Sequence, residues 1–307
     1  MNTVFFDSPA GDDIRRQGLY DGQLYVFSPT PGSLALVELA RDLIHKAFGT
    51  LDPLKAQYEM PVEKYVAILT ELKPTFIHHP KSKECIQQIL RDFGCDPDKV
   101  YFDVPRMRTS TSDAYLTSGI AYAFHPHRDT WYSAPYCQLN WWMPIYEIES
   151  GNSMAFHPRY WTHPVKNGSR EYNYDEWNKV GRKVAAQQIK SDTRKQPHAE
   201  EPLDLDPQIR IVAKPGGILV FSGAQMHSSV PNTTGNTRFS IDFRTVHIDD
   251  VKSLTGAPNI DSECTGTTMR DYLRGSDLEH IPEDLVARYE AGPPQRATFQ
   301  QAVAKQG

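Results

Sequence analysis

Two histidines and one aspartate have the residue types and spacing of a metal site. His127 and Asp129 are separated by a single residue, and His227 follows them about 100 positions later. On a β-strand, residues two apart point to the same side, so one strand could present both the imidazole and the carboxylate. A distant second histidine would complete a two-histidine, one-carboxylate set, which leaves three positions of an octahedral iron(II) open.

The His-x-Asp pair is a weak signal when it is taken alone. The 11 histidines and 38 acidic residues predict about one such His-x-Asp/Glu pair by chance, and the sequence contains three. The pair at 198–200 lies in a highly charged segment, and the pair at 247–249 follows the last clear strand. Only His127 is followed by several expected strands before another histidine, His227, occurs on a strand. The sequence therefore favours His127 and His227, with the carboxylate between them, as the ligands.

Arg238 is the second residue whose type and position suggest a role in binding. It lies eleven residues beyond His227, across a loop at 231–235. If this loop closes a hairpin, His227 and Arg238 face each other on paired strands, and Ser229 and Ser240 share their face. A guanidinium beside hydroxyls, one strand from a metal, suits a carboxylate that chelates the metal by its other end.

The elements that must position these residues change character along the chain. After a short expected strand at 24–27, apolar periodicity predicts helices from Ser33 to Phe48, from about Pro61 to Lys73, ending before Pro74, and from Ser82 to Gly94. From residue 100 onward, short runs of β-formers separated by turn signals predict strands and a sandwich or jelly roll. These runs are 100–104, 120–124, 138–148, 153–156, 209–213, 218–221 and 239–246.

A charged segment interrupts the expected strands. Residues 165–209 contain 8 basic and 8 acidic residues among 45. Two interpretations stay open for it: a solvated surface insertion, or a lid over a site, since long excursions in compact domains are often functional.

Composition excludes several classes of protein. The net charge of −5 and the lack of a basic cluster argue against a nucleic-acid surface. No run of apolar residues is long enough for a membrane span, and the first residues do not resemble a signal peptide. The four cysteines show no CxxC spacing, which favours reduced thiols. We expect a cytoplasmic protein that acts on a small molecule, while its oligomeric state is left open.

The order of these motifs resembles a known family. The pattern is His127-x-Asp129, then Glu149 to Pro158 (ESGNSMAFHP), then Pro215 to Ser222 (PGGILVFS), then His227, Pro231-Asn232 and Arg238-Phe-Ser240. It is similar to the iron(II)- and 2-oxoglutarate-dependent dioxygenases, and most similar to the phytanoyl-CoA dioxygenase branch. The resemblance spans about residues 120–246.

The resemblance implies a fold, a domain organisation and residue roles. The fold would be mostly β with flanking α: a double-stranded β-helix (a cupin-like jelly roll) with N-terminal helices packed against it. A single domain over 1–307 would comprise a mainly helical flank (1–99), the core (100–246) with its insertion (165–209), and a helical tail (247–307). His127, Asp129 and His227 would bind Fe(II), and Arg238 would bind the distal carboxylate of 2-oxoglutarate, helped by Ser229 or Ser240. O2 would be the oxidant, and His125 could lie near the co-substrate or merely pack at a strand end.

Further residues are candidates for the co-substrate or the substrate. On the strand at 138–148 we expect the face that carries Gln138, Asn140 and Trp142 to point inward, with Asn140 near the co-substrate. Trp131 and Tyr132 lie just after Asp129, so they are expected to meet the substrate. Arg159, after the turn at 156–158, is a further substrate candidate. Arg106 and Arg108 share a strand face and could either meet an anionic substrate or be surface charges, and Arg244 is the alternative to Arg238.

Three functions remain open from the sequence. The first is oxidation, most simply hydroxylation, of a small polar metabolite or natural-product intermediate, with release of succinate and CO2. The second is a cupin-like metal-dependent isomerase or hydrolase that does not use 2-oxoglutarate. The third is a jelly-roll module that binds a ligand without catalysis.

Overall fold

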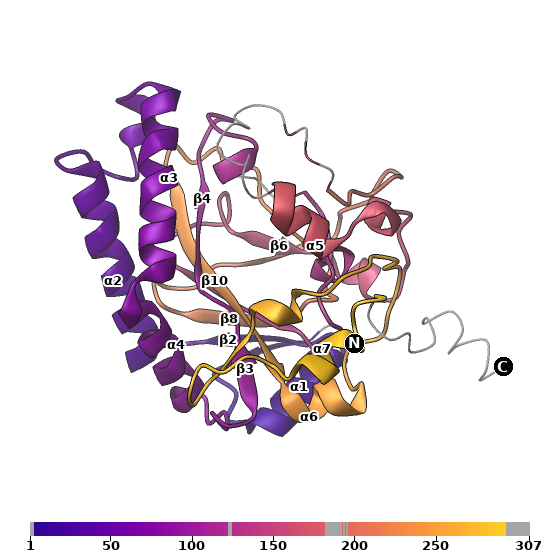
Figure 1. Cartoon of the computed structure of the whole chain (residues 1–307). Helices are drawn as coiled ribbons and strands as arrows, with labels where there is room; N and C mark the ends of the chain where they lie inside the picture. Colours follow the sequence, from indigo (N-terminus) through magenta and orange to yellow (C-terminus); the bar gives the residue numbers. More distant parts are fainter. Residues whose placement is uncertain (1–2, 122–124, 182–191, 193, 195, 293–307) are drawn as a thin grey trace.

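Two β-sheets and a layer of helices build the protein (Figure 1). The computed structural model describes residues 3–121, 125–181, 192, 194 and 196–292. The α-helices are α1 (Asp12–Tyr20), α2 (Pro31–Phe48), α3 (Val62–His78), α4 (Pro80–Asp92), α5 (Tyr174–Glu176), α6 (Ile248–Ser253) and α7 (Glu283–Ala287). The strands are β1 (Val4–Phe6), β2 (Leu24–Phe27), β3 (Val100–Phe102), β4 (Arg106–Ser110), β5 (Leu139–Pro144), β6 (Met154–Phe156), β7 (Ile209–Ile211), β8 (Ile218–Ser222), β9 (His227–Ser229), β10 (Arg238–His247) and β11 (Leu273–Arg274).

The larger sheet has eight strands. Its order is β1-β2-β8-β5-β10-β3-β11, and β4 also pairs with β10. The smaller sheet has the order β7-β6-β9, and an isolated bridge between His127 and His227 adds one more segment beside β9. Consecutive segments of the core therefore pass repeatedly from one sheet to the other.

The larger sheet separates two apolar clusters. Its outer face packs against the N-terminal helices, of which α2, α3 and α4 lie together on one side of the molecule in Figure 1. Its inner face packs against the smaller sheet through Leu24, Val26, Trp142, Leu219 and Phe221 on one side and Met154, Phe156 and Ile211 on the other. The predicted packing of N-terminal helices against a β core is confirmed.

Strand β5 explains how one strand serves both faces. Leu139, Trp141 and Met143 belong to the cluster under the helices, whereas Trp142 belongs to the cluster between the sheets. Because side chains alternate along a strand, Asn140 also points inward with Trp142. The predicted assignment of the two faces of this strand is correct.

Two details of the predicted helices are wrong. Helix α2 begins one turn earlier than expected, because Thr30 is the N-cap and Ser33 makes the reciprocal bond of the capping box. Helix α3 does not end before Pro74 but continues through it to His78. A proline inside a helix removes one backbone hydrogen bond, but Phe76, beyond the proline, is fully buried against the core. This burial keeps the last turn helical.

The predicted hairpin between His227 and Arg238 is also wrong. Strand β9 pairs with β6 in the smaller sheet, whereas β10 pairs with β5, β4 and β3 in the larger one. The loop between β9 and β10 is held by Asn232, whose side chain donates to the carbonyls of Ser110 and Asn236. The chain therefore crosses from one sheet to the other instead of turning back on itself.

The strand expected at 120–124 is replaced by a short 3-10 helix at Gly119–Ala121, and residues 122–124 lie outside the described residues. The centre of the charged segment, at 182–191, lies outside them as well. Its flanks are not wholly solvated, because Val165, Tyr172 and Tyr174 are buried. The lid therefore stays a prediction.

After β10 the chain forms α6, β11 and α7, so the expected helical tail also contributes a strand, which pairs with β3. No helix in the described part of the chain is long and apolar enough to cross a membrane.

Candidate metal centre

His127, Asp129 and His227 meet between the two sheets. One ligand atom from each residue lies within 4.8 Å of the others. The Nε2 atoms of His127 and His227 are 3.4 Å and 3.9 Å from Oδ1 of Asp129, and the two imidazole centres are 4.3 Å apart. Both histidines are buried. Two imidazole nitrogens and one carboxylate oxygen thus converge on a single point.

The main chain orients both histidines. The backbone amide of each donates to the carbonyl of the other, at 3.0 Å in both directions. Nδ1 of His127 is 2.8 Å from the carbonyl of His125, and Nδ1 of His227 is 2.9 Å from that of Gln225. A proton on Nδ1 satisfies each carbonyl and leaves Nε2 with a lone pair for a metal. Burial, aided by the neighbouring His127, lowers the pKa of His227 to about 3, so this ring is neutral at ordinary pH.

Asp129 does not lie on a strand, as the sequence had suggested, but begins a short 3-10 helix (Asp129–Tyr132). Its Oδ1 faces the histidines, while Oδ2 accepts hydrogen bonds from Asn140 Nδ2 at 2.8 Å and Gln138 Nε2 at 3.1 Å. Burial alone would raise the pKa of this carboxyl, but the bond to His127 and the charge of Arg244 hold the pKa well below its usual value. Asp129 is therefore an anion with one oxygen fixed and the other directed to the candidate metal.

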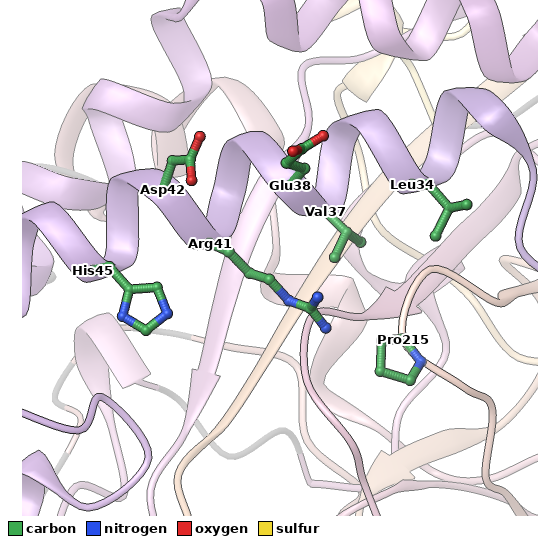
Figure 2. A pocket seen from close by; sticks show the side chains of 7 residues that line it. All are labelled: Leu34, Val37, Glu38, Arg41, Asp42, His45 and Pro215. Carbon is green, nitrogen blue, oxygen red and sulfur yellow. The ribbon is translucent and has the colours of Figure 1, made fainter.

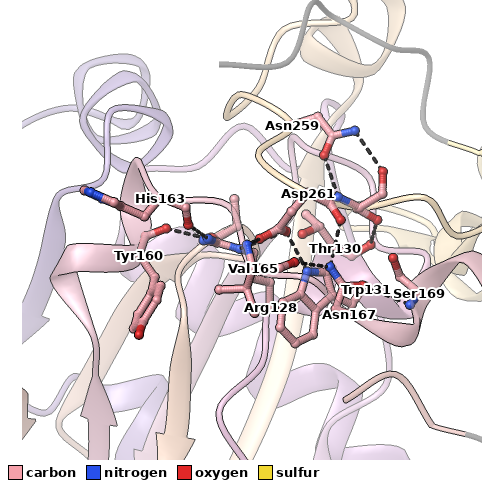
Figure 3. Close-up of polar contacts among 12 residues, drawn as sticks. Arg128, Thr130, Trp131, Tyr160, His163, Val165, Asn167, Ser169, Asn259 and Asp261 are labelled. Atoms are coloured by element: carbon pink, nitrogen blue, oxygen red, sulfur yellow. Dashed lines mark hydrogen bonds and ion pairs between the residues drawn. The ribbon is translucent and has the colours of Figure 1, made fainter. Parts of the chain in front are cut away.

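A buried network secures the segment between the ligands (Figure 3). Arg128 is completely buried and pairs with Asp261, at 3.1 Å and 3.2 Å from its Nε. The same guanidinium donates to the carbonyls of Ala224, Tyr160 and His163. Asp261 also accepts from the indole of Trp131 at 2.6 Å. Arg128 thus ties the ligand loop to the loop before β9 and to the C-terminal segment.

Arg238 is buried on the same inner face of the larger sheet. Its Nη1 donates to the carbonyls of Asn152 and Ser153 at 3.0 Å and 3.2 Å, and its guanidinium lies 5.6 Å from the ring centre of Trp142. Among the described residues no carboxylate lies within ion-pair distance of it. Its Nε and the Oγ of Ser240 are buried without a hydrogen-bond partner. Burial lowers the pKa of Arg238 to about 10, so it remains a cation.

Arg244, the alternative to Arg238, already forms ion pairs with two carboxylates. Its Nη1 is 3.0 Å from Asp103 Oδ2, and its Nε is 3.8 Å from Asp129 Oδ2. Despite burial, these carboxylates hold the pKa of Arg244 well above its usual value. Of the two cations, Arg238 alone combines burial with an orphaned donor.

The other predicted site residues divide into two groups. Asn140 supports Asp129, Trp142 stacks beside Arg238, and the ring of Tyr132 lies 5.5 Å from that of His127. Trp131 instead is fully buried against Asp261, and Arg159 pairs with Asp204 on the surface, so neither faces the metal centre.

The remaining candidates lie as follows. Ser229 ends β9 two residues beyond His227, and Arg106 pairs with Asp103 on the inner face. His125 is exposed, and its ring lies 5.8 Å from that of His198. His247, of the third His-x-Asp pair, is the N-cap of α6 and accepts from the amide of Asp249. This local pattern is therefore a helix cap.

Two supporting residues carry no signal in the sequence that would have revealed their roles. Gln138 was placed on the inward face, but its contact with Asp129 depends on Tyr272, whose hydroxyl donates to Gln138 Oε1 at 2.7 Å. Because Oε1 accepts this bond, Nε2 must point to Asp129. Tyr272 lies far along the chain, so only the tertiary fold brings the three residues together.

A groove of about 470 Å³ lies far from this chemistry, along α2 (Figure 2). Glu38, Arg41, Asp42 and His45 line it beside Pro215. Arg41 is occupied by the carbonyl of Ile145, at 2.9 Å and 2.7 Å. A second groove, of about 280 Å³, is lined by Tyr172 and His198 and lies closer to the metal centre.

No protein-family model and no curated protein sequence matches the chain. Among solved structures, EvdO2 from Micromonospora carbonacea var. aurantiaca is 14% identical, with a TM-score of 0.45, over 78% of this chain and 91% of that one. ThoJ, a non-heme monooxygenase, is 13% identical with a TM-score of 0.40, over 91% and 86%. SnoN, a non-heme alpha ketoglutarate dependent epimerase from nogalamycin biosynthesis, is 12% identical with a TM-score of 0.38, over 77% and 82%.

Proposed function

We propose that this protein is a non-haem oxygenase that uses iron(II) and 2-oxoglutarate. One observation carries the proposal: a two-histidine, one-carboxylate cluster shares the interior with a buried arginine that has no carboxylate partner among the described residues. The cluster fits a metal, and the arginine fits the free end of a chelating dicarboxylate.

The donor set suits iron(II). Two neutral imidazoles and one carboxylate on one side of an octahedral ion leave three positions for other ligands. The supporting contacts suit this role as well, since each Nδ1 faces a carbonyl and the second oxygen of Asp129 is held by two amides. Such outer contacts fix the orientation of metal ligands.

The position of Arg238 suits 2-oxoglutarate. Strand β6 pairs with β9, and the carbonyl of Ser153 accepts both from Val230 N and from Arg238. The guanidinium therefore lies beside the end of β9, three residues from His227, or about 10 Å of strand. A five-carbon dicarboxylate chelating the metal would extend toward this end. Ser229 and the orphaned Oγ of Ser240 are the hydroxyls placed to assist.

The sheet order supports a double-stranded β-helix. On the larger sheet β4, β10, β5 and β8 are neighbours, and on the smaller one the segment at His127, β9, β6 and β7 are neighbours. Eight segments divided in this way between two facing sheets correspond to a jelly roll. The specific likeness to the phytanoyl-CoA dioxygenase branch stays a prediction from the sequence.

The reaction assigned to this site is the oxidation of a C–H bond. Iron(II), held by His127, Asp129 and His227, would supply the activation of O2, with one oxygen atom ending in the substrate, the other in succinate, and CO2 as the second product of 2-oxoglutarate. The residues of the chain hold the metal, fix the co-substrate by its distal carboxylate, and enclose both between the sheets. We propose hydroxylation of a small polar metabolite or natural-product intermediate, with Tyr132 beside the metal as a substrate contact.

An anaerobic titration tests the proposal. Iron(II) is added first and 2-oxoglutarate second, and the visible spectrum is recorded after each addition. We expect a weak charge-transfer band that requires both. In the His227→Ala variant the band should be absent, because a ligand is missing.

The alternative functions give different results. Metal binding without any 2-oxoglutarate-dependent band, and without 2-oxoglutarate binding by calorimetry, would favour the isomerase or hydrolase. A protein that binds no divalent metal would favour the non-catalytic module. If the band appears, screening of small polar metabolites for succinate release identifies the substrate.

A further inference from the structure

Two inward-facing arginines share one carboxylate close to the metal centre. Nη1 of Arg106 and Nη1 of Arg244 both contact Oδ2 of Asp103, the latter at 3.0 Å. The other oxygen of Asp103 accepts the backbone amide of Arg244 at 2.7 Å. Both oxygens of this carboxylate are therefore occupied, and one negative charge faces two guanidiniums.

Asp129 cannot supply the missing charge once a metal is bound. It lies 3.8 Å from Arg244, but its Oδ2 already accepts from Asn140 and Gln138 and its Oδ1 faces the histidines. A bound divalent cation would take up the charge of this carboxylate. The two guanidiniums would then keep an excess of one positive charge in a poorly solvated place, which is costly unless an anion joins them.

The neighbouring charges do not remove this excess. Asp242 lies opposite Arg106 on β10, but it is bound by Arg108 through two bonds, at 2.5 Å and 3.1 Å. Lys73 approaches from α3, where burial and then Arg108 lower the pKa of its amine to about 7. Lys73 can therefore add positive charge near Arg106 and Arg108, but it cannot supply the missing negative charge.

Accessibility distinguishes the guanidiniums from the carboxylate beneath them. The side chains of Arg106 and Arg244 keep 16% and 18% of their surface exposed, whereas that of Asp103 keeps 1%. A ligand can thus reach surface on both cations but not on the carboxylate between them, and Arg244 places one of these cations 3.8 Å from Asp129. Arginine pairs suit carboxylate and phosphate because each guanidinium is a planar fork of donors.

We propose that Arg106 and Arg244 bind an anionic group of the substrate, a carboxylate or a phosphate, and so select substrates that carry the anion a few bonds from the oxidised carbon. This inference rests on the proposed function, since it takes the substrate to be the molecule oxidised at the metal. The short distance between Arg244 and Asp129 is the reason why the anion of the substrate should lie only a few bonds from the carbon that is oxidised.

Calorimetric titration of small anions tests the proposal without turnover. Acetate and sulfate serve as probes of the two anion classes, and each is titrated into protein loaded with zinc(II) and 2-oxoglutarate. We expect saturable binding of at least one probe, weakened at least tenfold in Arg106→Gln and less in Arg106→Lys, which keeps the charge but loses the fork. Asp103 keeps Arg244 as a partner in both variants, so they should fold, and thermal melts check this. Arg159→Gln, on the surface, is the matched control.

Four outcomes would overturn the proposal or separate it from the proposed function. Absence of saturable binding, or an unchanged affinity in Arg106→Gln, overturns it. Loss of 2-oxoglutarate binding in Arg106→Gln but not in Arg238→Gln also overturns it, because the pair would then hold the co-substrate. Finally, Arg106-dependent anion binding in zinc-loaded protein that binds no 2-oxoglutarate supports the anion site and contradicts the oxygenase.

Discussion

Replacement of Arg238 by methionine should have two effects of opposite sign. Methionine has a similar length and no charge, so the substitution removes the cation while filling most of its space. In the absence of ligand, the parent protein buries a guanidinium that has two carbonyl acceptors and an unpartnered Nε. Replacing buried charges by apolar groups of similar volume is often neutral or stabilising. We expect the melting temperature of ligand-free Arg238→Met to equal or exceed that of the parent.

The affinity for 2-oxoglutarate should fall steeply in the same variant. Loss of the partner of a buried charge costs about 3–5 kcal/mol, and each factor of ten in affinity corresponds to about 1.4 kcal/mol. The dissociation constant should therefore rise by about two to three and a half orders of magnitude. Metal affinity should be nearly unchanged, because no ligand of the metal is altered.

The assay combines melting curves with calorimetry. Metal-loaded parent protein should be stabilised by 2-oxoglutarate by about 2.7 kcal/mol when the ligand is present at a hundred times its dissociation constant, whereas Arg238→Met should show no such stabilisation. Arg159→Met, at an exposed arginine, is the control for the substitution itself. General destabilisation cannot produce a retained melting temperature together with a lost response. A variant that binds 2-oxoglutarate within threefold of the parent would refute the assignment of Arg238.

Three further predictions address the metal and its surroundings. His227→Ala should abolish stoichiometric iron binding and leave a folded protein. His247→Ala should keep the metal and lose only about 1 kcal/mol of stability with its helix cap. Metal analysis and melting curves distinguish the two variants, and full iron affinity in His227→Ala would contradict the assignment. Gln138→Ala should weaken the metal about 10- to 100-fold in a competition with a chelator, because Asp129 loses one of its two amide donors; an unchanged affinity would leave Asn140 as the sole support. Lys73 has a folded pKa of about 7, below its unfolded value, so the parent should gain stability as pH rises from about 7 to 10. Lys73→Met should remove this slope in melting temperatures measured across that range, and an equal slope in both proteins would show that Lys73 is not the cause.

The cluster of His127, Asp129 and His227 could be predicted from the sequence because the chemistry of a metal site is restrictive. Few side chains bind iron, and the requirement that His227 follow several strands selected His127 among three similar pairs. The faces of β5 were predictable for a related reason, since alternation along a strand is a local property. Features that depend only on residue type and on local geometry, such as these two, can be predicted from the sequence.

The contacts that complete the site depend on distant parts of the chain. The hairpin proposed between β9 and β10 failed because Asn232 binds Ser110, more than a hundred residues earlier, and this contact directs the chain into the other sheet. The bond between Tyr272 and Gln138 is equally remote. Helix α3 passes Pro74 because Phe76 is buried, which a local rule about proline cannot anticipate.

The late position of Asp261 and Tyr272 has a consequence for biosynthesis. A nascent chain that has emerged only as far as residue 250 carries all three candidate metal ligands and every inner-face arginine discussed above. It still lacks the carboxylate that anchors Arg128 and the hydroxyl that sets the amide of Gln138. During synthesis the three candidate ligands are therefore present before the groups that hold them in place, so the candidate metal centre cannot be completed until the last fifth of the chain is being made.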